Sequence, residues 1–227
     1  MITSIASAGL IGFGAYFSPH VERLRSVKAL KKLVRAKRTL ILTYDDGPSD
    51  SVTPKLLSLL RSHGAHATFF MLGRSAKQFS SVADRVLQEG HEIGCHTDSH
   101  LNAWKTNPWR AIADIDAGYS ALSTWVPSNG TFRPPYGKIT LPTYLAIRRR
   151  GASLGWWTID SGDTHDRLPH PQKVAETAVN DGGGIVLMHD LDHSPERNDF
   201  VLETTSVLLK LATREAFTIK RLSDLCH

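Results

Sequence analysis

Residues 42–50 read LTYDDGPSD, an apolar run that ends on two adjacent carboxylates and a Gly-Pro turn. Successive side chains of a strand point to opposite faces, so Asp45 and Asp46 at a strand tip can serve two different purposes. Asp, Gly and Pro are also ordinary turn residues. The fragment alone therefore fits a solvated turn equally well, and the rest of the chain has to decide.

Short apolar runs alternate with amphipathic stretches from residue 39 onward. Strands are expected at 39–44, 66–72, 91–96, 130–135, 152–159, 184–189 and 216–220. Helices are expected near 51–62, 75–89, 108–125, 140–150, 171–180 and 199–213. Strands that alternate with helices are typical of a parallel sheet with crossover helices. About seven such strands, without a Gly-rich phosphate loop, favour a (β/α) barrel of the α/β class.

Composition supports one large domain. The chain has 227 residues, of which 41% are hydrophobic, and a formal net charge of +5. The basic residues are concentrated between Arg23 and Arg38 and again at 148–150, which is a local patch and not a nucleic-acid-binding stripe, so we expect no nucleic-acid partner. Two distant cysteines, Cys95 and Cys226, support neither a disulfide framework nor a zinc-cysteine cluster.

The N-terminal residues 1–38 differ from the folded domain expected at 39–227. The first 17 residues carry no charge, but this is short for a membrane span, and a secretory signal would begin with basic residues. The Lys/Arg-rich stretch follows the apolar one, an order that would hold the downstream domain in the cytoplasm. We expect membrane association through residues 1–17, with a helix packed on the domain, or a truncated anchor, as the alternative. The expected location is the membrane or the cell envelope, and the cytoplasm is the alternative location.

Catalytic groups of (β/α) barrels lie at the C-terminal ends of the strands, and five expected strand tips carry polar side chains. These tips contribute Asp45 and Asp46, His96 and His100, Arg133, Asp160 and Asp163, and His189 and Asp190. Their clustering at one end of the barrel is hard to explain by solvation alone.

The pair His96 and His100 has the spacing of a metal site, although the spacing alone is weak evidence. In a chain with 11 histidines, roughly 0.5 such pairs arise by chance, and His189 and His193 form a second one. Two imidazoles with one carboxylate of the paired acids would leave open positions on a divalent ion for water and substrate. We therefore predict a metal site at His96, His100 and one of the paired acids, with the second histidine pair as the rival.

The segments TYDDGPS, HTDSH, RPPYG, TIDSGD and LMHD, in this order, closely resemble the five motifs of the polysaccharide deacetylases, the NodB-type carbohydrate esterases. The resemblance covers residues 39–225. It implies a distorted (β/α) barrel and the metal-dependent hydrolysis of N-acetyl, sometimes O-acetyl, groups on sugars. It also implies an acetylated carbohydrate as substrate and a divalent ion as cofactor, with zinc expected before cobalt, nickel or manganese.

The resemblance divides the two adjacent acids. Asp46 would bind the metal with His96 and His100, and Asp45 would act as general base on the metal-bound water, the nucleophile. A metal lowers the pKa of its bound water, so a carboxylate base suffices near neutral pH. On this interpretation one acid holds the ion and its neighbour takes the proton.

The remaining catalytic roles also come from the resemblance. Arg133 would pair with the base, and the backbone N–H of Tyr136 would stabilise the oxyanion. His189 would be the general acid that protonates the leaving amine, and Asp160 would hold its ring and raise its pKa.

Substrate contacts are expected from Leu187, as a wall of the acetyl pocket, from Pro135 of RPPYG, and from Trp157. Adjacent tryptophans on a strand face opposite ways, so at most one of Trp156 and Trp157 reaches the groove. Thr164 stands where the family often has an aromatic residue, which leaves the groove wall and the sugar undetermined. A hydrolase of non-sugar amides, or a catalytically silent carbohydrate-binding protein, are the alternatives on the same fold.

Overall fold

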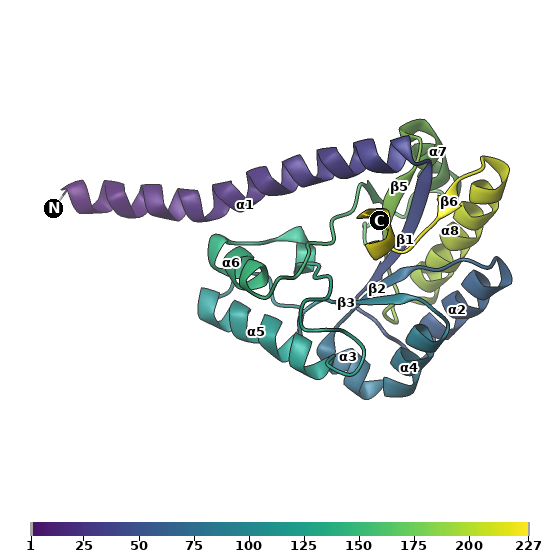
Figure 1. The fold of residues 1–227 in the computed structure, drawn as a ribbon, viewed down its shortest axis with the longest axis horizontal. Helices are drawn as coiled ribbons and strands as arrows, with labels where there is room; N and C mark the ends of the chain where they lie inside the picture. Colours follow the sequence, from purple (N-terminus) through teal and green to yellow (C-terminus); the bar gives the residue numbers. More distant parts are fainter. Residues whose placement is uncertain (1, 227) are drawn as a thin grey trace.

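The structure is a computed structural model that describes the backbone of residues 2–226 and the side chains of residues 19–225 (Figure 1). Its strands are β1 (Thr39–Asp45), β2 (Thr68–Met71), β3 (Glu92–Cys95), β4 (Ile159–Asp160), β5 (Gly184–His189) and β6 (Thr218–Ile219). Its helices are α1 (Ile2–Ala36), α2 (Thr53–Ser62), α3 (Gly73–Gln78), α4 (Ser80–Gln88), α5 (Pro108–Ala121), α6 (Leu141–Arg149), α7 (Pro171–Asp181) and α8 (Pro195–Arg214), with 3-10 turns η1 (Pro135–Gly137) and η2 (Ser223–Cys226).

The strands form one sheet in the order β3-β2-β1-β5-β4, and β6 pairs with the first residues of β1. Every described pairing is parallel. Helices α2 to α8 lie between successive strands along the chain and cover the outside of the sheet (Figure 1). This arrangement confirms the parallel α/β architecture predicted from the alternation of strands and helices.

Single bridges close the sheet into a distorted barrel. Cys95, at the end of β3, pairs in parallel with Phe132, and Phe132 pairs with Leu154. The chain then continues from Leu154 into β4, which pairs with β5, the neighbour of β1. The segment between Leu154 and β4 therefore joins the two edges of the sheet.

Two of the expected strands are much shorter than predicted. The strand expected at 130–135 is only the bridge at Phe132, because Pro134 and Pro135 have no N–H to donate to a neighbouring strand. The strand expected at 152–159 is reduced to the bridge at Leu154 and the two residues of β4. Both short segments leave their following loops free to enter the mouth of the barrel.

The alternation along β1 separates the outer core from the barrel interior. Leu40, Leu42 and Tyr44 join the large hydrophobic cluster under the helices. Ile41 belongs to a second, smaller cluster with Phe70 and Ile185, closed at one end by residues from α1 and the C-terminal segment. Since side chains two residues apart share a face, the row that starts with Ile41 ends on Asp45 at the mouth of the barrel.

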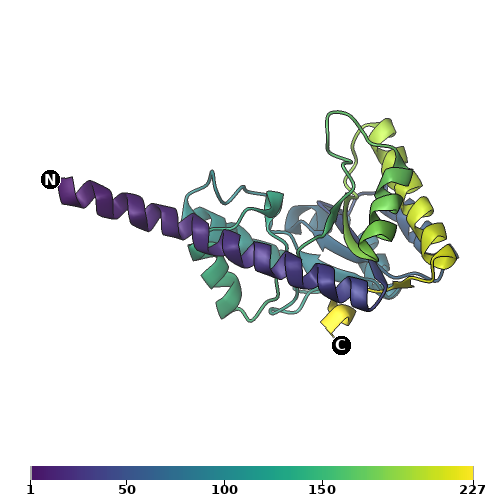
Figure 2. The same ribbon diagram turned by 90° about the horizontal axis from the view of Figure 1, so that it is seen from above.

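Helix α1 is one continuous helix across Pro19, and it extends beyond the domain at its N-terminal end (Figures 1 and 2). Its C-terminal half packs against α6, β1 and β5, as the alternative of a packed N-terminal helix expects. Of the helices in the described part of the chain, none combines the length and apolar composition needed to cross a membrane. Membrane association through residues 1–17 depends on side chains outside the described ones and stays a prediction.

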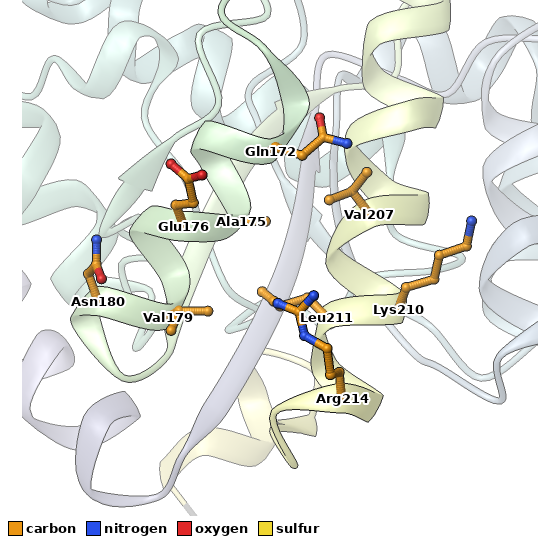
Figure 3. A pocket seen from close by; sticks show the side chains of 9 residues that line it. All are labelled: Gln172, Ala175, Glu176, Val179, Asn180, Val207, Lys210, Leu211 and Arg214. Atoms are coloured by element: carbon orange, nitrogen blue, oxygen red, sulfur yellow. The ribbon is translucent and has the colours of Figure 1, made fainter.

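A groove of about 720 Å³ lies between α7 and α8 on the outside of the barrel (Figure 3). It is lined by Gln172, Ala175, Glu176, Val179, Asn180, Val207, Lys210, Leu211 and Arg214. None of these residues belongs to the predicted site, which lies at the C-terminal ends of the strands.

Candidate active site

The strand tips converge as predicted for a (β/α) barrel. Asp45 on β1 and His189 on β5 are direct register partners at the C-terminal ends of adjacent strands. His96 follows β3, and Arg133 follows the bridge at Phe132, which pairs with the end of β3. The parallel register therefore brings side chains from four distant stretches of sequence to one mouth.

Asp46, His96 and His100 lie together as expected of a ligand set. Asp46 Oδ1 is 3.4 Å from His96 Nε2 and 3.2 Å from His100 Nε2. One ligand atom from each residue lies within 4.8 Å of the other two. In the described part of the chain, this is the one such group of three or more histidine, cysteine or acidic side chains.

The chemistry of these three residues fits a divalent cation. The Nδ1 atom of His96 is 2.7 Å from the carbonyl oxygen of Arg133. Because a carbonyl only accepts, Nδ1 carries the proton, and Nε2 keeps its lone pair toward Asp46. Asp46 Oδ1 is buried without a hydrogen-bond partner, an expensive arrangement for a carboxylate unless a cation binds there.

Asp114 on α5 fixes the loop that carries His100, and the sequence analysis did not identify it. Its carboxylate accepts hydrogen bonds from the Ser99 N–H (2.9 Å), the Ser99 hydroxyl (2.6 Å) and the Leu101 N–H (3.3 Å). Within this loop the N–H of His100 donates to Thr97 Oγ1. Thr97 and His100 both have a positive φ, which is costly for residues other than glycine. The carboxylate therefore holds a strained loop on both sides of a predicted ligand.

Arg133 is completely buried beneath the mouth and pairs with Asp45. Its Nη1 atom donates to Asp45 Oδ1 at 2.7 Å and to Thr43 Oγ1 at 2.8 Å, and its Nε atom donates to the Gly155 carbonyl at 2.7 Å. The guanidinium also lies 4.0 Å from the centroid of the Phe70 ring. Burial lowers the pKa of Arg133, and the charge of Asp45 opposes that shift. The predicted pairing of Arg133 with Asp45 is present.

His189 is held by Asp163, so the predicted partner Asp160 has to be corrected. Asp163 accepts from the His189 N–H at 2.7 Å and lies 3.0 Å from His189 Nδ1. Although burial favours the neutral ring, the hydrogen bond and charge of Asp163, together with Asp45, raise the pKa of His189 to about 9. The half-exposed Asp160 instead accepts from the Gly162 N–H at 2.9 Å.

Asp190 anchors the turn that follows the paired acids. Its carboxylate accepts from the Gly47 N–H at 3.1 Å and from the Thr53 hydroxyl at 2.6 Å, and its carbonyl accepts from Ser49. A Cβ atom on Gly47 would lie 2.2 Å from Asp190 Oδ1, so this position has no room for a side chain. Burial raises the pKa of Asp190 to about 7, against the effect of these hydrogen bonds. The sequence analysis placed Asp190 at a strand tip without giving it this role.

Tyr136 lies in the η1 turn with a φ of 57°, and its exposed ring is 4.5 Å from that of His100. Pro135 in the same turn is buried. Leu187 is also buried and precedes His189 by two residues on β5, so both side chains face the barrel interior. These positions agree with the predicted contacts, and the roles themselves stay predictions.

The remaining predicted residues have other surroundings. The Trp157 ring lies 5.7 Å from the Arg133 guanidinium and packs on the cluster at the closed end of the barrel. The rival pair is less favoured, because neither His189 nor His193 belongs to the ligand group found among the described residues. Thr164, in place of the family aromatic, is exposed. Contact of Trp157 with a sugar therefore stays a prediction.

Comparison with known proteins decides the family. Residues 32–154 match the family model described as polysaccharide deacetylase. The chain belongs to the polysaccharide deacetylase family. It is 33% identical over 156 residues to a peptidoglycan-N-acetylglucosamine deacetylase of Bacillus cereus, an alignment that covers 68% of this chain and 73% of the relative. A chitooligosaccharide deacetylase of Azorhizobium caulinodans is 29% identical over 164 residues, 70% of this chain and 77% of that protein.

Other relatives of this polysaccharide deacetylase are longer proteins. The peptidoglycan-N-acetylglucosamine deacetylase PgdA of Listeria monocytogenes is 34% identical over 193 residues, and the match covers 83% of this chain but 39% of PgdA. A crystal structure of a peptidoglycan N-acetylglucosamine deacetylase superposes with a TM-score of 0.74 at 26% identity, covering 84% of this chain and 89% of that one. These matches confirm the predicted fold and the predicted class, a deacetylase that hydrolyses C–N bonds.

Proposed function

We propose that this protein removes acetyl groups from N-acetylated sugars of an oligo- or polysaccharide with the help of a divalent metal ion. The observation that carries the proposal is the buried Asp46 Oδ1, which has no hydrogen-bond partner and faces two imidazole nitrogens. The arginine-paired Asp45 and the aspartate-paired His189 end the neighbouring strands. A base, a ligand set and an acid together are the parts that hydrolysis of an acetamide requires.

Asp45 is suited to accept a proton from the attacking water. Arg133 holds one of its oxygens at 2.7 Å, and the other lies 3.8 Å from His96 Nε2, facing the proposed ligand set. The buried guanidinium keeps the carboxylate oriented through this charge-assisted hydrogen bond. An ion bound by Asp46, His96 and His100 would supply Lewis acidity, polarising the water and the acetyl carbonyl.

His189 is suited to donate a proton to the leaving nitrogen. Its pKa of about 9 keeps the imidazolium form at neutral pH, and Asp163 on Nδ1 leaves Nε2 as the donating atom. The N–H of Tyr136, which lies in the strained turn, would stabilise the developing oxyanion. Leu187, on the same face as His189, would contact the acetyl methyl group.

The donor set also suggests the metal and the substrate class. Two neutral imidazoles and one carboxylate suit zinc, with cobalt, nickel and manganese as alternatives that the same ligands accept. Relatives named as peptidoglycan and chitooligosaccharide deacetylases favour substrates that contain N-acetylhexosamine. These relatives, and not the ligand set, favour this function over the hydrolysis of small non-sugar amides.

Acetate release tests the proposal. The purified, zinc-loaded protein is incubated with N-acetylglucosamine oligomers and, separately, with a panel of small non-sugar amides, with Asp45→Asn as the matched inactive control. We expect acetate from the oligomers with the unmodified protein and none with the variant. Hydrolysis of the non-sugar amides alone would show that the protein is a hydrolase of a different class. Hydrolysis of neither panel would indicate a carbohydrate-binding protein without activity.

A further inference from the structure

Arg23 of α1 reaches the turn that contains Tyr136, although 114 residues separate Arg23 from Gly137. Its Nη1 atom donates a hydrogen bond to the Gly137 carbonyl at 3.1 Å. Its guanidinium carbon lies 5.1 Å from the centroid of the Trp156 ring and 4.8 Å from that of Trp157. Arg23 also precedes the residues that match the family model, 32–154, so this contact comes from outside the matched region.

The surroundings of Arg23 are unusual for a charged side chain. Arg23 is only partly exposed, burial lowers its pKa, and no ion pair with a carboxylate offsets that burial among the described residues. Two aromatic rings and one carbonyl take the place of a counter-ion. A guanidinium is planar and its donors point in fixed directions. Contact with the ring faces and with a single carbonyl therefore holds the Arg23 side chain in one orientation.

The turn that Arg23 contacts is strained and tightly packed. Tyr136 and Gly137 have consecutive positive φ values of 57° and 61°. A Cβ atom on Gly137 would lie 2.6 Å from Trp157 Cη2 and 3.0 Å from Arg23 Cζ, so Arg23 and Trp157 directly support the backbone at that residue. A backbone in a sparsely populated conformation persists only when its surroundings hold it there.

We propose that Arg23 is a positioning residue of the active site, through which α1 holds the Gly137 carbonyl and thereby aims the preceding Tyr136 N–H at the reacting carbonyl. The kinetic part of this inference rests on the proposed function. The Trp157 ring, which Arg23 contacts, also lies 5.7 Å from the guanidinium of Arg133, the partner of Asp45. Helix α1 therefore supports the geometry of the active site through Arg23.

Kinetics of Arg23→Ala, compared with Arg25→Ala, test the inference in the full-length protein. Arg25 is exposed on the same helix and serves as the matched control. An oxyanion donor acts mainly in the transition state, so we expect kcat of Arg23→Ala on N-acetylglucosamine oligomers to fall roughly 10- to 100-fold, with little change in KM. Metal content should stay at the level of the unmodified protein. Unchanged kcat, or an equal loss in Arg25→Ala, would overturn the inference.

Hydrogen exchange of the same variants separates this inference from the proposed function. The N–H groups of Gly137 and Lys138 donate to Pro134 and Pro135 at 2.9 and 3.0 Å and report on the turn. We expect their exchange to be roughly tenfold faster in Arg23→Ala, with no change in Arg25→Ala or in β1. Equal protection in both variants would overturn the inference even for an active enzyme. Selective loss in a protein that releases no acetate would instead support the positioning contact and refute the proposed function.

Discussion

Replacing Asp163 with asparagine should lower the pH at which the enzyme loses activity on the alkaline side. The carboxylate of Asp163 accepts from both the backbone N–H and the ring of His189. An asparagine offers one oxygen for these two contacts and no charge. The imidazolium of His189, the proposed general acid, therefore loses the partner that stabilises its protonated form.

The size of the effect follows from the surroundings of His189. Burial on its own would lower the pKa, and Asp163, followed by Asp45 and Asp46, raises it from 6.5 to about 9. At 1.36 kcal/mol per pH unit, this difference favours the charged ring by about 3 kcal/mol. Because Asp163 is the leading favourable contribution, its loss should move the alkaline limb down by more than about one pH unit. A general acid contributes roughly 10²–10⁴-fold, so the maximal rate should also fall at least about tenfold.

The assay is the pH dependence of kcat for acetate release between pH 5 and about 10, with Asp160→Asn as the matched control. The exposed Asp160 does not contact His189, so its variant should keep the profile of the unmodified protein. The raised pKa also predicts that the stabilisation from charged His189 is complete below 6.5 and is lost as the pH rises through about 9. An alkaline limb that moves in Asp160→Asn and stays in Asp163→Asn would refute the reasoning.

Four further variants test neighbouring parts of the site. Asp45→Asn should keep its metal and lose turnover, whereas Asp46→Asn should lose metal affinity; equal metal loss in both, measured by elemental analysis, would contradict the division of labour. Arg133→Met leaves the buried Asp45 without its charged partner and should reduce the free energy of unfolding by roughly 3–5 kcal/mol, measured by denaturant titration, with an unchanged midpoint as the contrary result. Asp114→Asn should weaken metal binding about 10- to 100-fold by calorimetric titration, because the loop around His100 loses its anchor; unaltered affinity would show that the loop holds itself.

The sequence alone predicted the parts of the fold that depend on local pattern. The alternation of apolar runs with amphipathic stretches gave the parallel sheet, and the strand tips gave the convergence of Asp45, His96 and His189. The two closing segments were predicted as full strands, because apolar and aromatic composition is the same in a strand and in a short bridge. Their lengths are set by the prolines after Phe132 and by the geometry of closure, which composition does not report.

The roles that the sequence did not reveal depend on contacts between residues that are far apart in the chain. Asp160 and Asp163 both follow the fifth apolar run, and Gly162, with a φ of 75°, reverses the backbone between them. Because of this reversal the two carboxylates point in different directions, and it is Asp163 that faces His189. Asp114 lies on a helix far along the chain, and Arg23 lies in a basic stretch that resembles an ordinary solvated surface. A tertiary contact of this kind leaves no local signal in one sequence.

The metal content of single histidine variants tests the central claim most directly. The protein is purified unmodified and as His96→Ala, His100→Ala, His189→Ala and His193→Ala, loaded with zinc, desalted and measured by elemental analysis. We expect one ion per chain in the unmodified protein and in the His189 and His193 variants, and loss of the ion in the His96 and His100 variants. Retention of the ion in His96→Ala together with its loss in His189→Ala would contradict the proposed site.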